Sequence, residues 1–250
     1  MIFKNWDQIA TSQLRKQALE IADAAYEVIN TKKAIRRQFL YDSSNNTLAV
    51  LSHQFQLDDF ERVVCVGFGK AAFEAVGGIY AILGDKIKCG YVIDLKGGQI
   101  GNLICKIGTH PRPTVVNVQA TEELTEMLDG CGEKDLVICV VSGGGSALLC
   151  HPHEMSCEQE SEIIMSLTAN GANISELNTV RKHISKVKGG QLAKIIFPAT
   201  SLNLIFSDVP GNDLSVVASG PTVKDETSAE DAREILKKYG VEGEYSLLET

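Results

Sequence analysis

Apolar residues along the chain form two alternating patterns, short uninterrupted runs and positions at helical spacing. The uninterrupted runs predict buried strands at 63–66, 91–93, 103–107, 136–141 and 202–206. Helical spacing predicts helices at 71–83, 120–128, 157–170, 181–194 (with a glycine interruption at 189–190) and 229–239. An amphipathic helix is also expected over residues 9–30, before the first strand. This alternation predicts an α/β fold with a doubly wound, mainly parallel sheet flanked by helices.

Composition narrows the class of protein. No repeat, low-complexity segment or linker is evident in the 250 residues, so one domain over 1–250 is expected. The net charge of −8 argues against nucleic-acid and anionic-membrane partners. No apolar run approaches the ~18–20 residues of a membrane span, and the charged N-terminus lacks a signal-peptide core. Seven cysteines, an odd number scattered without paired spacing, indicate a reducing compartment, so we expect a cytoplasmic protein.

The segment 137–149, VICVVSGGGSALL, combines a strand, a flexible turn and the start of a helix. In an open α/β sheet this junction lies at the carboxyl edge, where ligands bind. The second glycine of a G-x-S-x-G nucleophile elbow is missing around Ser146. A glycine turn for close packing is one interpretation and anion binding is the other, and we favour anion binding. The candidate binding groups are the amides and hydroxyls of Ser142, Gly143, Gly144, Gly145 and Ser146.

The segment GFGKAA, residues 67–72, allows three interpretations. With Asp94 at the end of a predicted strand, Gly67 and Gly69 fit a relaxed dinucleotide fingerprint. Lys70 instead suits a phosphate or carboxylate partner through charge attraction. A tight turn with a solvated lysine is the third interpretation. A Walker A loop is excluded, because the spacer and the Ser or Thr that holds Mg²⁺ are missing.

Residues 176–193, ELNTVRKHISKVKGGQLA, concentrate positive charge in an acidic protein. On a continuous helix, Arg181, Ser185 and Lys188 would share one face and Lys182 and Lys186 another. Such a run is often a solvated surface. The neighbouring glycines and Asn178 favour recognition of phosphate or of a carboxylated substrate.

Two aspartates follow the last predicted strand, in SDVPGNDLSVVASGPT, residues 207–222. Asp208 and Asp213 could hold Mg²⁺, or one of them could serve as a base. Local capping of backbone amides is the alternative. Two cysteines and two histidines form a second set of candidate metal ligands: Cys150, His151, His153 and Cys157. Their spacing matches no standard zinc pattern, so we expect no metal at these residues.

Five ordered motifs, GFGKAA, GTHPRPT, DLVICVVSGGGSALL, ELNTVRKHISKVKGGQLA and SDVPGNDLSVVASGPT, resemble the N-terminal domain of the MOFRL-type glycerate 2-kinases. Some members of that family carry older hydroxypyruvate reductase labels. The resemblance extends over roughly residues 10 to 240. It implies a Rossmann-like domain that faces a smaller C-terminal domain, and ATP-dependent phosphorylation of D-glycerate at its 2-hydroxyl with Mg²⁺.

The resemblance also implies roles for single residues. Lys70 matches the lysine of the family's GKA segment, near the reacting groups, and Asp208 matches its S-D-V aspartate. Arg181 and Lys188 match basic residues of the N-x-V-R-K-H-x-S-x-x-K-G-G segment, which Asn178 opens. One departure is Asn212, where the family commonly has an acidic residue, and this could weaken metal binding.

The second departure is the end of the chain at Thr250, where the family continues into its second domain. We therefore expect one wall of a cleft, which leaves three alternatives: a truncated gene, a half-enzyme completed by another chain such as a separately encoded C-terminal domain, or a binding module without catalysis. A second copy of the chain is another possible protein partner, which would make a homo-oligomer. Two functions of other classes stay open at this point: a ligand-binding or regulatory domain without catalysis, and an NAD(P)-dependent reductase that uses GFGKAA and Asp94.

Overall fold

The centre of the molecule is a parallel sheet of five strands in the order β6-β5-β4-β7-β8. The computed structural model describes residues 2–241 and 243–250. The strands span β4 Arg62–Phe68, β5 Ile87–Asp94, β6 Ile104–Ile107, β7 Asp135–Ser142 and β8 Thr200–Phe206. All five predicted strands are confirmed, and so is the doubly wound α/β fold.

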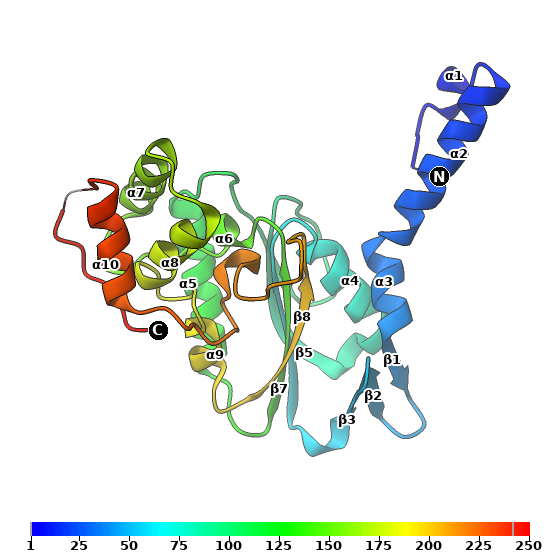
Figure 1. Cartoon of the computed structure of the whole chain (residues 1–250). Coiled ribbons are helices and arrows are strands. Elements are labelled where there is room, and N and C mark those ends of the chain that lie inside the picture. Colours follow the sequence, from blue (N-terminus) through cyan, green and yellow to red (C-terminus); the bar gives the residue numbers. More distant parts are fainter. Residues whose placement is uncertain (1, 242) are drawn as a thin grey trace.

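Helices cover both faces of this sheet because its central strands are apolar on both sides (Figure 1). On β4, Val63 and Cys65 belong to a core shared with α3 (Thr31–Gln38) and α4 (Ala72–Leu83). The alternate residues of β4 pack in a second core against α5 (Val115–Asp129) and α9 (Gln191–Ile196). Continuous apolar runs are typical of such two-sided burial.

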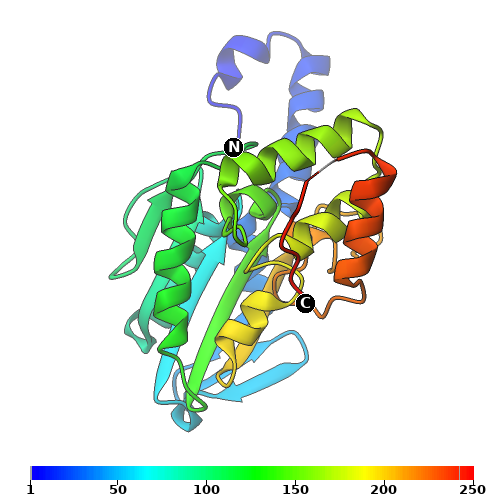
Figure 2. The ribbon, with the colours of Figure 1, turned by 90° about the vertical axis from the view of Figure 1, so that its left-hand side faces the viewer.

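Three further helices pack together beside the sheet, α7 (Cys157–Ala169), α8 (Ile174–His183) and α10 (Ala229–Lys238). Each begins with a capping box, in which the side chain of the N-cap residue and that of the third helical residue satisfy free amides. Figure 2 shows α7 running across the upper edge of this group, with α10 beside it. The packing places Glu160 of α7 and Arg181 of α8 around one cavity with Gly144, which follows the carboxyl end of β7.

The predicted N-terminal amphipathic helix is present as α2 (Gln13–Val28), which follows the short α1 (Trp6–Ile9). Ser12 caps it by accepting a hydrogen bond from the amide of Arg15 at 3.3 Å. None of its residues is buried, and it projects away from the sheet (Figure 1). Its apolar positions Leu14 and Ile21 are 79% and 72% exposed, so this helix adds nothing to the core.

A small antiparallel sheet has no counterpart in the sequence predictions. It consists of β1 (Phe39–Asp42), β2 (Thr47–Val50) and β3 (His53–Gln56). Its inward residues Phe39, Leu48 and Val50 extend the core on the α4 side of the main sheet. Among the residues that the structure describes, no helix is long and apolar enough to cross a membrane.

Candidate functional site

The candidate site lies where the order of the strands reverses. From β4 the chain continues to β5 and β6 on one side, whereas β7 and β8 lie on the other. β4 and β7 are paired in register, with Phe68 opposite Val141, so both strands end at the same level of the sheet. In open α/β sheets the crevice outside such a switch point is where ligands bind.

The turn after β4 is held by backbone contacts with its neighbours. The amide of Gly69 donates to the carbonyl of Ile93 at 3.1 Å, and that of Lys70 donates to the carbonyl of Gly143 at 3.0 Å. Gly69 has φ +111°, and a Cβ there would overlap the backbone of Ser142. A Cβ on Gly67 would lie 2.8 Å from Cγ2 of Val76. The two glycines therefore allow close packing, and their predicted role in ligand binding stays a prediction.

Ser142, the last residue of β7, connects the two strand ends. Its buried hydroxyl accepts a hydrogen bond from the amide of Ala71 at 3.2 Å and donates to the carbonyl of Phe68 at 3.4 Å. Its single proton is thus used within the protein. The structure places this serine as a brace for the turn that carries Lys70.

Three side chains from different segments converge on the glycine loop that leads into α6 (Gly145–Leu148). A Cβ on Gly144 would lie 2.7 Å from Cε of Lys70 and 3.2 Å from Cδ2 of His110. A Cβ on Gly143 would lie 3.0 Å from Cγ of Asp208 and overlap its carboxylate. The loop needs glycine here because side chains lie directly over its backbone.

His110 was not among the predicted site residues, although it lies within the GTHPRPT motif. It follows β6, whose carboxyl end lies at the same edge of the sheet, and the peptide bond from His110 to Pro111 is cis. Partial burial, together with the charge of Lys70, lowers the pKa of His110 below its usual 6.5. The imidazole is therefore mostly neutral at pH 7. The signal that could have identified it is the position of the HPRP loop directly after a parallel strand.

A cavity of about 270 Å³ opens beside His110 and the glycine loop. It lies between the His110–Pro113 loop, the start of α6, one face of α7 and Arg181 of α8. Arg181 is half-buried, burial lowers its pKa, and it donates to Oδ1 of Asn178 at 3.3 Å. The other residues that line the cavity include Ser146, Ala147, Glu160, Ser161, Ile164 and Met165.

A chain of polar contacts leads from the glycine loop to Arg181. The hydroxyls of Ser146 and Ser219 lie 3.0 Å apart, and Ser219 also donates to Oδ1 of Asn178 at 3.1 Å. Ser219 is buried with φ 62°, so its backbone takes an uncommon conformation to make these contacts. Ser146 and Asn178, two of the predicted binding residues, are thus brought together.

The predicted helix at 181–194 is wrong over residues 184–188, whereas the predicted glycine interruption at 189–190 is confirmed. α8 begins earlier and ends at His183, residues 184–190 are irregular, and α9 starts at Gln191. The turn at Gly189 and Gly190 separates the two helices, because both glycines have positive φ. Arg181, Ser185 and Lys188 therefore do not share a helical face.

Two of the predicted cations are paired inside the protein. Nζ of Lys188 lies 3.0 Å from Oε1 of Glu160, and Nζ of Lys182 lies 3.0 Å from Oδ1 of Asp225. Lys186 is exposed. Of this basic segment, Arg181 is the residue that lines the cavity. The predicted role of Lys188 at a phosphate stays a prediction. In the structure its ammonium group is paired with the carboxylate of Glu160.

The two aspartates of the predicted magnesium site differ in their surroundings. Asp208 is exposed just after β8, with its carboxylate over Gly143. Oδ1 of Asp213 accepts hydrogen bonds from the amide and hydroxyl of Ser215 at 2.9 and 2.7 Å, which lower the pKa of Asp213. Within residues 2–241 and 243–250, no group of three or more His, Cys, Asp or Glu side chains could hold a metal. Because Mg²⁺ is often held by one or two carboxylates together with substrate phosphates, Asp208 fits that role.

Asp94 does not have the surroundings of a ribose-binding carboxylate. It is 1% exposed, and Oδ2 accepts a hydrogen bond from the amide of Phe73 at 2.9 Å. Oδ1 accepts from the amides of Leu95 and Lys96 at 2.6 and 3.2 Å. Both oxygens are used to join β5 to the start of α4. This geometry disfavours the dinucleotide interpretation of GFGKAA.

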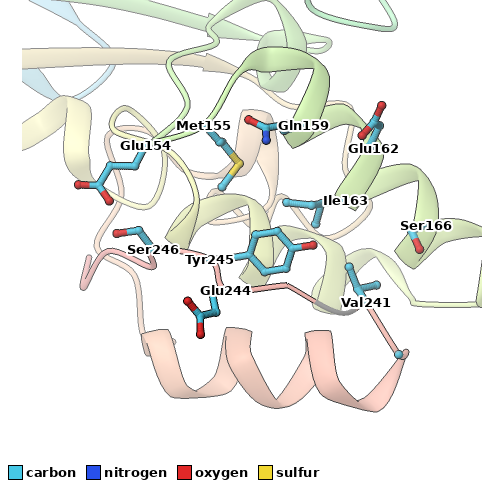
Figure 3. A pocket seen from close by; sticks show the side chains of 11 residues that line it. Glu154, Met155, Gln159, Glu162, Ile163, Ser166, Val241, Glu244, Tyr245 and Ser246 are labelled. Atoms are coloured by element: carbon cyan, nitrogen blue, oxygen red, sulfur yellow. The ribbon is translucent and has the colours of Figure 1, made fainter.

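A second cavity, of about 400 Å³, lies between α7, the two residues Glu154 and Met155 before it, and the C-terminal segment that follows α10. Figure 3 shows Tyr245 in it, near Met155 and Ile163. Its charged lining consists of Glu154, Glu162 and Glu244, and no lysine or arginine is among the described residues that line it. An acidic cavity of this kind repels phosphates and carboxylates, so the site beside Lys70 is the better candidate.

Comparisons with known proteins agree with the fold and the motifs. A family model described as a domain of unknown function, DUF4147, matches residues 17–247. D-glycerate 2-kinase of Thermotoga maritima is 37% identical over 233 residues, which cover 92% of this chain and 52% of that protein.

Two crystal structures resemble this one. Glycerate kinase of Thermotoga maritima superposes with a TM-score of 0.80 at 35% identity, over 93% of this chain and 53% of that one. A protein of Pyrococcus horikoshii gives a TM-score of 0.82 at 35% identity, over 92% and 52%. The chain spans about half the length of these relatives. It therefore belongs to the DUF4147 family, the N-terminal domain of the MOFRL-type glycerate 2-kinases.

Proposed function

We propose that this chain supplies the N-terminal half of a D-glycerate 2-kinase, which transfers the γ-phosphoryl group of ATP to the 2-hydroxyl of D-glycerate. The observation that carries this proposal is the convergence of Lys70, His110 and Asp208 on the glycine loop at the switch point of the sheet. The names of the relatives support the same reaction.

Lys70 and the loop amides would stabilise the charge that phosphoryl transfer concentrates at this point. The 2-hydroxyl oxygen bonds to the γ-phosphorus, the bond to the bridging oxygen breaks, and ADP leaves. Such reactions depend on positioning and on charge stabilisation more than on covalent chemistry of the protein. Lys70 is exposed at the crevice and lies over Gly144, so its ammonium group is available to a phosphate there.

The hydroxyl proton needs an acceptor near the same loop. His110 is suited to this because its lowered pKa keeps the imidazole neutral at pH 7. Asp208, across the loop, would hold Mg²⁺ together with the ATP phosphates, and the bound ion would neutralise part of their charge. Asp213, with one oxygen engaged by Ser215, would assist through its other oxygen or through water.

We expect the proposed enzyme to need a further domain. Since the relatives are about twice as long, we propose that a C-terminal domain closes the cleft and excludes water. The same domain would complete the ATP site. It is therefore the partner that we expect to change the rate most.

The test is an assay with ATP, Mg²⁺ and D-glycerate, in which ADP release is followed with and without the family's C-terminal domain added as a separate polypeptide. The proposal predicts release of ADP that depends on D-glycerate. Binding of D-glycerate without turnover in either condition would instead favour a regulatory or ligand-binding domain. Saturable binding of NADH or NADPH would favour the reductase.

A further inference from the structure

We propose that Arg181 and Asn178 bind the carboxylate of the acceptor substrate, in the cavity behind the His110–Pro113 loop. This subsite is separate from Lys70, which faces the transferred phosphoryl group. The inference rests on the proposed function, because it places the carboxylate of the acceptor at Arg181 and the transferred phosphoryl group of the same reaction at Lys70.

The guanidinium of Arg181 forms no ion pair in the part of the chain that the structure describes, and the one carboxylate whose charge acts on it, that of Glu160, is already bound to Lys188. It is half-buried, and its hydrogen bond goes to the neutral amide oxygen of Asn178 at 3.3 Å. No ion pair joins it to a described carboxylate within 4.0 Å. A cation removed from water without a counter-charge is costly, so an anionic ligand at this position would be stabilising.

Asn178, next to Arg181, has a buried hydrogen-bond donor without an acceptor among the described residues. The side chain is 4% exposed, and its oxygen accepts hydrogen bonds from both Arg181 and Ser219. Its amino group Nδ2 is buried with no partner among residues 2–241 and 243–250. A buried donor without an acceptor also costs free energy. Arg181 and Asn178 therefore both require an oxygen acceptor, and a carboxylate offers two.

The charges around the cavity favour one negative charge. Glu160 lines it, but Oε1 accepts from Nζ of Lys188 at 3.0 Å and Oε2 accepts from Sγ of Cys150 at 3.4 Å. This pair is neutral as a unit, which leaves the interior charge of Arg181 to be balanced. Arg112 lines the cavity from an exposed position. Such a site suits the carboxylate of a small hydroxy acid better than a polyphosphate.

The cavity also borders the proposed phosphoryl position. His110 and Gly144 line it; the side chain of Lys70 lies over Gly144, and its charge acts on His110. A small acid held by its carboxylate at Arg181 would therefore present its neighbouring hydroxyl toward His110 and Lys70. This order of groups matches a hydroxyl at the carbon adjacent to the carboxylate.

The experiment measures binding without ATP, by titration calorimetry of the chain with D-glycerate and with its neutral amide, D-glyceramide. The wild type should bind D-glycerate and prefer it to the amide. Arg181→Gln should weaken D-glycerate binding by about 10- to 100-fold, the usual range for a lost charged hydrogen bond, and should remove the preference. Arg181→Lys, which keeps the charge but loses the planar fork, should retain part of the preference. Lys224→Gln, at an exposed lysine outside the cavity, should leave both the affinity and the preference intact.

The outcomes separate this inference from the kinase proposal. Loss of the preference in Arg181→Gln, with an unchanged melting temperature, supports the subsite even if no phosphorylation is ever detected. Phosphorylation by an Arg181→Gln variant with an unchanged KM for D-glycerate overturns the subsite alone. A wild type that binds no D-glycerate, or that binds the amide equally well, also overturns it.

Discussion

Nζ of Lys188 lies 3.0 Å from Oε1 of Glu160, and the two side chains are 1% and 6% exposed. These residues stand on different segments, and their pairing joins the irregular stretch after α8 to α7. Removing one partner leaves a buried charge without compensation. We expect Lys188→Met to lower the free energy of unfolding by about 3–5 kcal/mol, measured by urea denaturation.

The matched control is Lys224→Met, which breaks the ion pair with Glu226 on the surface, where the two side chains are 83% and 80% exposed. Its free energy of unfolding should equal that of the wild type within error. If the two substitutions changed the free energy of unfolding equally, the buried Lys188–Glu160 pair would contribute no more to stability than the surface pair.

The pKa of His110 should respond to Lys70. Burial lowers it first and the charge of Lys70 lowers it further. Lys70→Met removes the second cause, so the pKa should rise but remain below 6.5. Proton NMR of the imidazole signals across pH 5 to 8 measures this.

His151 provides an internal control for this titration. Its pKa is also lowered by burial and then by the charge of Lys186. Lys186→Met should therefore raise the pKa of His151 and leave His110 unchanged. A His110 signal that titrates identically with and without Lys70 would contradict the arrangement of the two around Gly144.

Gly144→Ala should disturb the site and not only the backbone. The φ of Gly144 is +81°, and a Cβ there would lie 2.7 Å from Cε of Lys70. We expect a cost in unfolding free energy of at least about 1–2 kcal/mol for the left-handed conformation, with loss of D-glycerate-dependent ADP release.

The control Gly171→Ala separates the cost of the left-handed backbone from the disturbance of the site around Lys70. Gly171 has φ +88° and nothing within 4 Å of an added Cβ. It should show the backbone cost with unchanged activity. If Gly144→Ala keeps full activity, the loop does not position Lys70.

Asp94→Asn tests whether this carboxylate is structural. The amide has one acceptor oxygen in place of two, so the bonds to Phe73 and to Leu95 cannot both be kept. We expect a loss of about 1–3 kcal/mol in unfolding free energy. The exposed Asp129 offers the control Asp129→Asn, which should cost nothing measurable. Binding of NADH by the wild type that Asp94→Asn abolishes would instead restore the dinucleotide interpretation.

Local patterns predict the central sheet well because each strand is buried on both faces and therefore reads as an apolar run. The segment from Phe39 to Gln56 escaped prediction because its strands are only four residues long and half exposed. The helix at 181–194 was overextended for another reason. Its helical spacing continues through residues whose backbone is set by contacts with distant segments, such as that of Lys186 with the carbonyl of His151.

Charge was the least predictable property of the site. The basic segment appears in the sequence as one cluster, but Lys182 and Lys188 find their partners in Asp225 and Glu160, far along the chain. The position of Arg181 in a cavity likewise depends on how α7 packs against α8. His110 joins Lys70 through tertiary packing alone, because the two lie after different strands.

The most direct test of the central claim is ³¹P NMR of the product formed from ATP, Mg²⁺ and D-glycerate, with the family's C-terminal domain supplied. The account predicts 2-phosphoglycerate from the wild type and from Lys134→Met, a control at the opposite edge of the sheet, and none from Lys70→Met. Absence of 2-phosphoglycerate from the wild type, or undiminished formation by Lys70→Met, would contradict it.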